Sequence, residues 1–517
     1  MRKNILLIFV LFFTLCCSCF KDDTNTDYKE LKKPVLLIND EDEHAFKENQ
    51  PYEVVQGQTL RIVPYVEYDN PEDLSYEWFI DGKSVSQEKV LEWECNISKS
   101  TASGTLMIRR NSADNADVYS FFIMLLEPFE RAWTVLDREV GKVRLHVVNE
   151  KPASPSYIYT PYMNVMDEIE AISPLGVLEY WSTEKTNIVG EVMYLDADPS
   201  KCFSMDGKSL AKTVSLNQEW IGDEIPSGIR FKNALYCGFV DYLLADDGRL
   251  YMRKNGKGYY TGRFSDLPVK FEGEELIVSS MTLCQHKSKM AMLFDKKNGR
   301  FLVVNTDYDW NTQYFGDRAG DILSFPAKDG VNDWKGYEIV TSKFIKPFYS
   351  WDTDYTYFCI MKNPSGGLEA LEFVVEFNGR TSPSATITYE NIICPANMGV
   401  DSKFCILNDP YMGMIKSYVL YSAQNEPNSL YYVERKSKGL GEPKLYKAFD
   451  YKIMSLDHGK LGRTNSTVGI GLENGSLILY DLSKSWSVAN EKSFVTEISG
   501  FGEILEVNFK YGSVANF

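Results

Sequence analysis

Between residues 133 and 517 the chain repeats one local pattern, two runs of β-forming residues joined by a tight-turn dipeptide. The dipeptides are Asp206-Gly207, Asp247-Gly248, Asn298-Gly299, Asn378-Gly379 and Asn474-Gly475. Such dipeptides accept positive φ at little cost, so they join antiparallel strands. The turn glycines are 41, 51, 80 and 96 residues apart, and the two longer intervals correspond to double steps. A period of about 40 to 50 residues made of short strands is typical of a β-propeller.

The number of blades follows from the length of this region. At about 50 residues per blade, residues 133–517 predict seven or eight blades, of which we take seven. A pair of unrelated β-sandwiches is the alternative, because the region has no WD40 or kelch signature. Residues 129–517 are therefore assigned to the propeller.

In residues 34–128 apolar and polar residues alternate in short runs separated by turn signals. This pattern predicts a β-sandwich of about seven strands. Apolar residues occupy every second position from Leu60 to Val66 and again from Leu74 to Ile80. Such a period of two places them on one face of a strand. Trp78 is the expected centre of the core, while Phe121 stands where an antibody-type domain has a cysteine. Aromatic packing must then replace an inter-sheet disulfide. The whole chain is thus predicted to be all-β.

Residues 1–19 have the form of a secretory signal peptide, with Arg2 and Lys3 before an apolar run and small residues at its end. The apolar run, from Ile5 to Leu15, is too short to span a bilayer as a mature helix. Any membrane attachment must then be covalent. Residues 20–33 are polar and unpatterned, as expected of a flexible tether.

The end of this segment resembles a bacterial lipobox. Ser18 precedes Cys19, which the resemblance makes the acylated first residue of the mature chain. Lys21, Asp22 and Asp23 resemble the Lys-acidic-acidic export tag of Bacteroidetes surface lipoproteins. The resemblance implies an outer-membrane protein, lipid-anchored and exposed at the cell surface; a simple solvated tether with periplasmic retention is the alternative.

A second resemblance covers about the first 150 residues. The pattern of Gly57, Leu60, Pro64 and Val66, then Leu74-x-Tyr76-x-Trp78, and later Ala132-Trp133-Thr-Val-Leu136 is similar to the PKD-like lipoproteins of Bacteroidetes. That family implies a PKD/Ig-like domain, a binding role without defined catalytic residues, and partners among SusC/SusD-type uptake systems.

Charge and cysteine content exclude several functions. Acidic residues number 72 against 55 basic ones, a net charge of −17, which disfavours nucleic-acid binding because phosphate contacts need clustered cations. Seven cysteines remain beyond residue 19, widely spaced and without a CxxC motif, so no metal site is predicted. Most are expected to be buried and apolar. A bridge between Cys394 and Cys405 stays open.

Catalytic motifs are missing from the sequence, and no cofactor is predicted. There is no G-x-S-x-G, H-E-x-x-H, P-loop or dinucleotide fingerprint. The chain has four histidines, and His146 alternates within a strand, as a structural residue does. A glycosidase that uses only two carboxylates is still compatible with the sequence.

Two aromatic loops are the candidate ligand site. One contains Tyr308, Asp309 and Trp310, and the other contains Tyr349, Trp351 and Asp352. Aromatic faces beside oxygen acceptors suit sugar rings, so a glycan or a peptide is the expected ligand. The alternative is that these aromatic residues fill gaps between blades. A calcium loop at Asp307 to Arg318 is disfavoured, because it lacks the glycine and the glutamate of that motif.

Three functions follow from the sequence. The first is a non-enzymatic ligand-binding or accessory lipoprotein of a SusC/SusD-type uptake system. The second is a propeller enzyme that acts on glycans, and the third is a structural or adhesive surface protein. The missing motifs favour the first.

Overall fold

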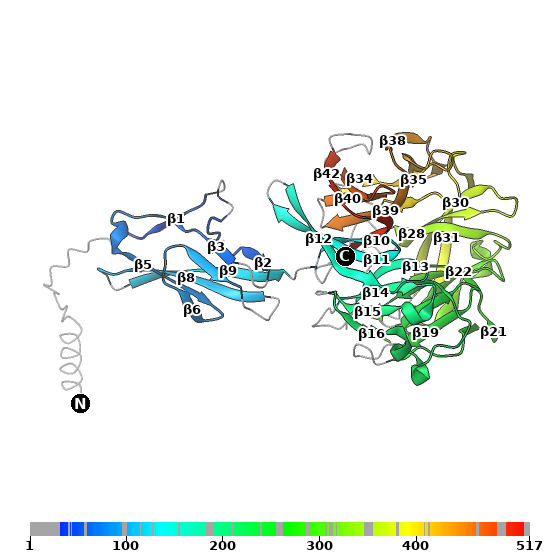
Figure 1. Cartoon of the computed structure of the whole chain (residues 1–517), viewed down its shortest axis with the longest axis horizontal. Helices are drawn as coiled ribbons and strands as arrows, with labels where there is room; N and C mark the ends of the chain where they lie inside the picture. The colour runs from blue at the N-terminus through cyan, green and yellow to red at the C-terminus, as the bar shows by residue number, and fades with distance from the viewer. Residues whose placement is uncertain are drawn as a thin grey trace, which may run out of the picture. The chain divides into compact units, whose positions relative to one another are not determined.

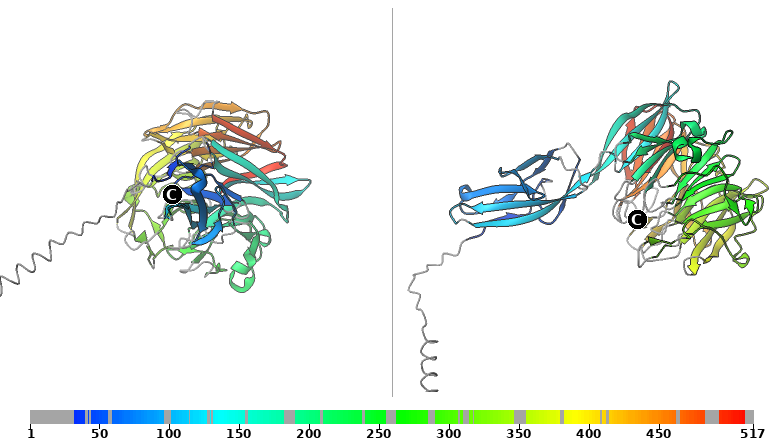
Figure 2. Two further views of the ribbon diagram at one scale, coloured as in Figure 1. Left: turned by 90° about the vertical axis from the view of Figure 1, so that its left-hand side faces the viewer. Right: turned by 90° about the horizontal axis from the view of Figure 1, so that it is seen from below.

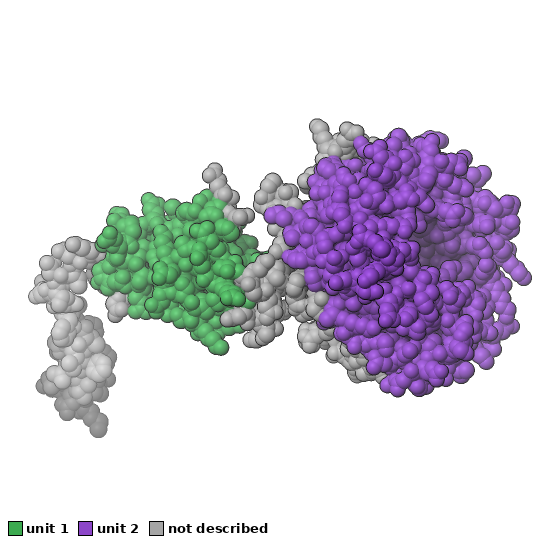
Figure 3. Space-filling view, viewed as in Figure 1, with its two compact units in different colours: residues 1–126 green, residues 127–517 purple. Residues whose placement is uncertain are grey.

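The structure is a computed structural model, and the chain divides into two compact units, residues 1–126 and 127–517 (Figure 3). Regular structure in the described residues is β-strand, apart from five short 3-10 helices. Within this part of the chain no helix has the length and apolar character needed to cross a membrane. The described residues are 32–39, 42, 44–55, 59–95, 101–113, 115–126, 129, 131–153, 156–181, 190–207, 210–237, 240–254, 262–284, 290–305, 308–309, 314–316, 318–345, 355–378, 382–407, 409–411, 414–461, 465–482 and 493–510.

The first unit is a β-sandwich, as predicted. A five-stranded sheet has the order β2 (Pro51–Val55), β9 (Asn115–Leu126), β8 (Thr101–Arg110), β5 (Leu74–Ile80) and β6 (Lys83–Ser86). Two further pairs share its core: β1 (Val35–Leu37) with β4 (Tyr65–Glu67), and β3 (Thr59–Ile62) with β7 (Leu91–Glu94). The helix η1 (Pro71–Asp73) precedes β5.

Trp78 is the centre of this core. Its side chain is fully buried, and its indole N–H donates to the Glu88 carbonyl at 2.9 Å. The Phe121 ring meets it edge-on, with ring centroids 5.9 Å apart. Trp78 and Phe121 lie on two strands of the same sheet, and the Phe46 ring contacts both of them, with centroids 6.1 and 5.8 Å away. The core is thus packed by aromatic rings, as the sequence indicated.

In the described residues the second unit contains seven sheets of three to five strands and three two-stranded sheets. Figure 1 labels most of the strands of the seven larger sheets. Blade 1 is β43 (Glu503–Lys510), β10 (Ala132–Glu139), β11 (Lys142–Ala153) and β12 (Ser156–Ile169). Blade 2 is β13 (Pro174–Trp181), β14 (Gly190–Asp196), β15 (Phe203–Asp206) and β16 (Lys212–Ser215). Blade 3 is β17 (Phe231–Tyr236), β18 (Val240–Ala245) and β19 (Leu250–Lys254). Blade 4 is β22 (Val278–Leu283), β23 (Ala291–Asp295), β24 (Arg300–Val304) and β27 (Ile322–Ser324).

The remaining blades complete the series. Blade 5 is β28 (Glu338–Ile345), β29 (Tyr355–Lys362), β30 (Leu368–Asn378) and β31 (Ser382–Ile393). Blade 6 is β32 (Phe404–Ile406), β35 (Tyr418–Ser422), β36 (Ser429–Lys436), β37 (Gly439–Leu440) and β38 (Lys444–Ala448). Blade 7 is β39 (Ile453–Leu461), β40 (Asn465–Leu472), β41 (Ser476–Asp481) and β42 (Phe494–Ser499). Short connecting elements are η2 (Pro199–Lys201), η3 (Leu216–Glu219), η4 (Ile221–Asp223), η5 (Ala327–Asp329), β20 (Lys270–Phe271), β21 (Glu274–Glu275), β25 (Tyr308–Asp309), β26 (Tyr314–Phe315), β33 (Asp409–Tyr411) and β34 (Met414–Lys416).

The sheets form a closed ring. The first strand of each blade contacts the first strand of the next, in the order β43, β13, β17, β22, β28, β32, β39 and back to β43. In Figure 2 (left) the blades follow one another around this ring in chain order. The ring therefore has seven blades, and the predicted β-propeller is confirmed.

Burial between blades holds the ring together. Seven hydrophobic clusters are found, each drawing on two neighbouring blades. Strand β29 shows how one strand serves two of them: Tyr357 and Cys359 face blade 4, while Phe358 and Ile360 face blade 6. Because both faces of a blade are covered by neighbouring blades, the sequences of its strands are almost continuously apolar.

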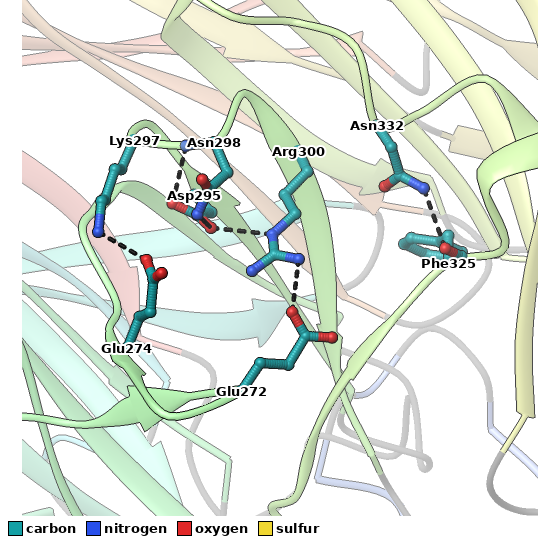
Figure 4. Close-up of polar contacts among 8 residues, drawn as sticks. All are labelled: Glu272, Glu274, Asp295, Lys297, Asn298, Arg300, Phe325 and Asn332. Atoms are coloured by element: carbon teal, nitrogen blue, oxygen red, sulfur yellow. Dashed lines mark hydrogen bonds and ion pairs between the residues drawn. The ribbon is translucent and has the colours of Figure 1, made fainter.

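The Asn298-Gly299 dipeptide joins β23 and β24, as its turn chemistry predicts (Figure 4). Gly299 has φ 67°, and a Cβ atom there would collide with the Lys335 backbone. Asp295 accepts from the Asn298 amide group at 2.8 Å and from Arg300 Nε at 3.0 Å. Arg300 also reaches Glu272 at 2.9 Å, in the turn between β20 and β21. A polar network thus fixes this turn.

Candidate functional site

Most of the predicted site residues lie outside the described residues. These are Cys19, Lys21, Asp22 and Asp23 in the first unit and Trp310, Tyr349, Trp351 and Asp352 in the propeller. Tyr308 and Asp309 form β25, which pairs with β26. Their ligand contacts stay a prediction.

The strands that flank the two aromatic loops show where those loops begin. Strands alternate in direction within a blade, so first-to-second and third-to-fourth connections leave on the same side of the ring, here called the loop face. One loop follows β24, the third strand of blade 4, and the other follows β28, the first strand of blade 5. Both loops therefore start from the loop face, in adjacent blades.

Two carboxyl groups near the ring axis have perturbed acidity. Asp457 lies on β39 and Glu506 on β43, the first strands of blades 7 and 1. Burial raises the pKa of Glu506 to about 7, against hydrogen bonds from Val177 and Asn508 and the charge of Lys403. Burial also raises the pKa of Asp457, against the amides of Phe509 and His458 and the charge of Lys343. Each group can hold a proton at higher pH than a free carboxyl.

Both of these carboxylates are bound to backbone. Glu506 accepts from the Val177 N–H at 2.7 Å, and Asp457 accepts from the Phe509 N–H at 2.6 Å. Sequence reasoning missed them, because their partners belong to other blades. The alternation of β43 could only have marked Glu506 as a polar position between the apolar Leu505 and Val507.

A third carboxyl with raised pKa lies between blades 1 and 7. Glu150 lies in the second half of β11, is 4% exposed, and pairs with Tyr159 of β12. Burial raises its pKa to about 7, opposed by Tyr159 and Arg131 and reinforced by the charge of Asp481. Such shifts occur at functional sites and in structural networks alike.

His146 has the structural role expected from the sequence. Its ring is fully buried; Nδ1 accepts from the Asn164 N–H at 2.9 Å, and Nε2 lies 3.0 Å from Asp137 Oδ2. Although burial opposes it, hydrogen bonds from His146, Arg144 and the Gly502 amide hold the pKa of Asp137 well below its usual range. The histidine is thus fixed inside blade 1.

The described residues offer no group of three or more His, Cys, Asp or Glu that could hold a metal ion. All seven cysteines from Cys95 to Cys405 are buried thiols, as most were expected to be. Cys394 and Cys405 do not form the bridge that the sequence left open. Burial raises the pKa of each of these two thiols to about 12.

Comparison with known proteins identifies the N-terminal part of the chain. Residues 19–173 match the PKD-like family, a region that covers the sandwich and continues through β12. No curated protein matches the chain. Solved structures with a similar course of the chain include a quinoprotein alcohol dehydrogenase-like protein from Bacteroides thetaiotaomicron, at 12% identity and TM-score 0.31, covering 89% of this chain and 94% of that one.

Two further solved structures also match this chain. A DUF4784 family protein from Bacteroides caccae has 10% identity and TM-score 0.31, covering 89% of this chain and 97% of that one. The WD40 domain of SCAP from fission yeast has 8% identity and TM-score 0.33, covering 53% and 57%. The ring of seven blades is shown by the strand pairing and by the contacts between blades within this chain.

Proposed function

We propose that this chain, whose residues 19–173 match the PKD-like family, is a surface-exposed outer-membrane lipoprotein. In this proposal it is a non-enzymatic ligand-binding or accessory component of a SusC/SusD-type nutrient uptake system. The propeller presents the binding surface, and an extracellular glycan or peptide is the ligand.

One observation carries the anchoring part of the proposal. The family match begins at Cys19, the same residue that the lipobox-like sequence marks for acylation. The apolar segment before it lies outside the match, as expected of a signal peptide that is removed. Several acyl chains on one cysteine hold a protein at a membrane at about 0.8 kcal/mol per buried methylene.

The carboxyl groups of the propeller favour binding over catalysis. A general acid or base must come within hydrogen-bond reach of the substrate. Glu506 and Asp457 are committed to backbone amides, and Glu150 is 4% exposed. Each of these three carboxyl groups is thus either bound to backbone or buried, which supports a binding role for the loop face.

Acylation is tested by labelling cells with palmitate and fractionating their membranes. The wild-type protein should incorporate label and remain with the outer membrane, whereas Cys19→Ala should be unlabelled and released. A labelled, membrane-bound Cys19→Ala variant would overturn the anchoring proposal.

Export is tested separately by protease treatment of intact cells. Replacing Lys21, Asp22 and Asp23 with Ala should protect the protein from protease while leaving it membrane-bound. A matched control replaces Asp27, Lys29 and Glu30, which removes the same charges from the tether further from Cys19. Equal accessibility of both triple variants would reject the export tag.

Binding is tested by a glycan array followed by calorimetry. Trp310→Ala and Trp351→Ala should weaken binding more than Asp309→Asn, because ring burial gains free energy while water competes for polar contacts. Tyr451→Ala is the control, since Tyr451 is 49% exposed and lies before β39, on the side opposite the loop face. Turnover of a bound glycan would replace the binding proposal with an enzymatic one.

A further inference from the structure

The last strand, β43, closes the ring. It is the first strand of blade 1, although the other three strands of that blade come from residues 132–169. It pairs with β10, which is more than 360 residues away in the sequence, so closure depends on hydrogen bonds and packing rather than on chain connectivity. Its two neighbours in the ring are β39 of blade 7 and β13 of blade 2.

Polar side chains hold β43 from both sides. On the blade 7 side, Ser455 Oγ accepts from the Val507 N–H at 3.0 Å, and Asp457 accepts from the Phe509 N–H at 2.6 Å. These bonds satisfy backbone groups that the sheet itself leaves unpaired.

On the blade 2 side, both bonds meet at Val177. Glu506 accepts from the Val177 N–H at 2.7 Å, and the Asn508 amide donates to the Val177 carbonyl at 2.9 Å. We call Ser455, Asp457, Glu506 and Asn508 the seam.

Blade 2 is shaped to admit the Glu506 carboxylate. Gly176 has φ 148°, in the region that favours glycine, and a Cβ atom there would collide with the Glu506 carboxylate. A register shift between β13 and β14 falls at this glycine. The missing side chain thus leaves the space in which Glu506 reaches the Val177 amide.

We propose that the seam is a proton-dependent clasp, which holds the propeller ring closed more firmly at pH 5 than at pH 8. The charged groups around Glu506 are Asp457, which disfavours its ionisation, and Lys403, which favours it. Lys343 is the cation that acts on Asp457. This inference does not depend on the ligand or on lipid anchoring.

The direction of the effect follows from proton linkage. Burial raises the pKa of Glu506 from 4.5 to about 7. Between these two pH values the closed ring therefore retains a proton on Glu506 that the unfolded chain releases. The stabilisation is complete below pH 4.5 and is lost as pH rises through about 7. The raised pKa of Asp457 acts in the same direction.

Hydrogen exchange of the full mature chain tests the clasp. After correction for the intrinsic rate, exchange in peptides that contain Val177 and Phe509 should rise by roughly 10- to 100-fold between pH 5 and pH 8. Peptides from β8 of the sandwich are the internal reference and should show no such rise. If exchange in the peptides that contain Val177 and Phe509 did not change between pH 5 and pH 8 in the wild-type protein, the proposal would be overturned.

Variants assign the effect to the seam. Glu506→Gln keeps the shape of the side chain and should remove most of the rise. Glu503→Gln is the control, because Glu503 lies on the same strand with its side chain 48% exposed, and it should leave the profile unchanged. Equal profiles for the two variants would refute the assignment to Glu506. Gly176→Ala should raise exchange at every pH, because it displaces the carboxylate.

Discussion

Replacing Arg253 with Met should destabilise the propeller strongly. The guanidinium lies between two buried carboxylates, 2.7 Å from Asp241 and 2.6 Å from Glu219, with all three side chains at most 3% exposed. Its central carbon lies 4.8 Å from the centre of the Phe264 ring. Met preserves much of the length of the side chain but leaves two buried negative charges without this cation.

The expected loss is about 3 to 5 kcal/mol in the free energy of unfolding, the usual cost of breaking a buried pair from one side. The loss should depend on pH. Burial already raises the pKa of Glu219 against the attraction of Arg253, so removing Arg253 raises it further. A carboxyl group whose pKa is raised in the folded state stabilises that state only at low pH. The variant should therefore approach the wild-type stability near pH 4 and lose most near pH 8.

Unfolding in guanidinium chloride, followed by circular dichroism, measures this loss of stability in the unfolding transition of the propeller. The triple variant Glu219→Gln, Asp241→Asn, Arg253→Met should recover most of the stability, since these buried charges are then all removed. Lys296→Met is the exposed control: its pair with Glu338 spans 2.6 Å with both side chains about half exposed, so it should cost at most about 1 kcal/mol. A loss below about 1 kcal/mol for Arg253→Met at pH 8, or no recovery in the triple variant, would refute the reasoning.

Three further outcomes are expected. Trp78→Ala should cost the sandwich about 3 to 5 kcal/mol in denaturant unfolding and leave the propeller transition unchanged; a loss below about 1 kcal/mol would contradict its central place in the core. A fragment of residues 127–517 should fold alone with a cooperative melt, whereas residues 174–517 should not, because β43 then lacks its partner β10. A thiol reagent should label none of the seven described cysteines in the native protein and all seven in denaturant without reductant; five labelled thiols would reveal a disulfide.

The fold could be predicted because its signals are local. Asp-Gly and Asn-Gly dipeptides whose glycines have positive φ mark the turns between second and third strands at Gly248, Gly299 and Gly475. Alternation marks the strands around these turns. The corresponding turns of blades 5 and 6, residues 363–367 and 423–428, have no Asn-Gly or Asp-Gly pair. The pairs at residues 206–207 and 378–379 follow the third strands of their blades, β15 and β30, and not the second. The interval from residue 299 to residue 379 therefore runs from blade 4 to blade 5, so that predicted double step was wrong, and only the interval from 379 to 475 spans two blades. For this reason the blade count needed an average length instead of a direct count.

The buried polar contacts could not be predicted, because their partners are far apart in the sequence. Glu506 and Val177 are separated by 329 residues, and Arg253 and Glu219 by 34. A sequence shows that such residues are charged, but the ring geometry decides which of them meet. The aromatic loops were found from composition alone, so their role in binding stays a prediction.

The limits of the PKD-like match have a physical consequence for the region it covers. Residues 19–173 end directly before β13, so they include β10, β11 and β12 but no strand that pairs with the other edge of β10. In this chain β43 covers that edge, and its Phe509 ring packs edge-on against the buried Trp133, with centroids 5.0 Å apart. Without β43 the edge of β10 would expose unpaired backbone groups, and Trp133 would lose this contact. The matched region therefore cannot complete its own last sheet, and the strand it needs comes from the opposite end of the chain.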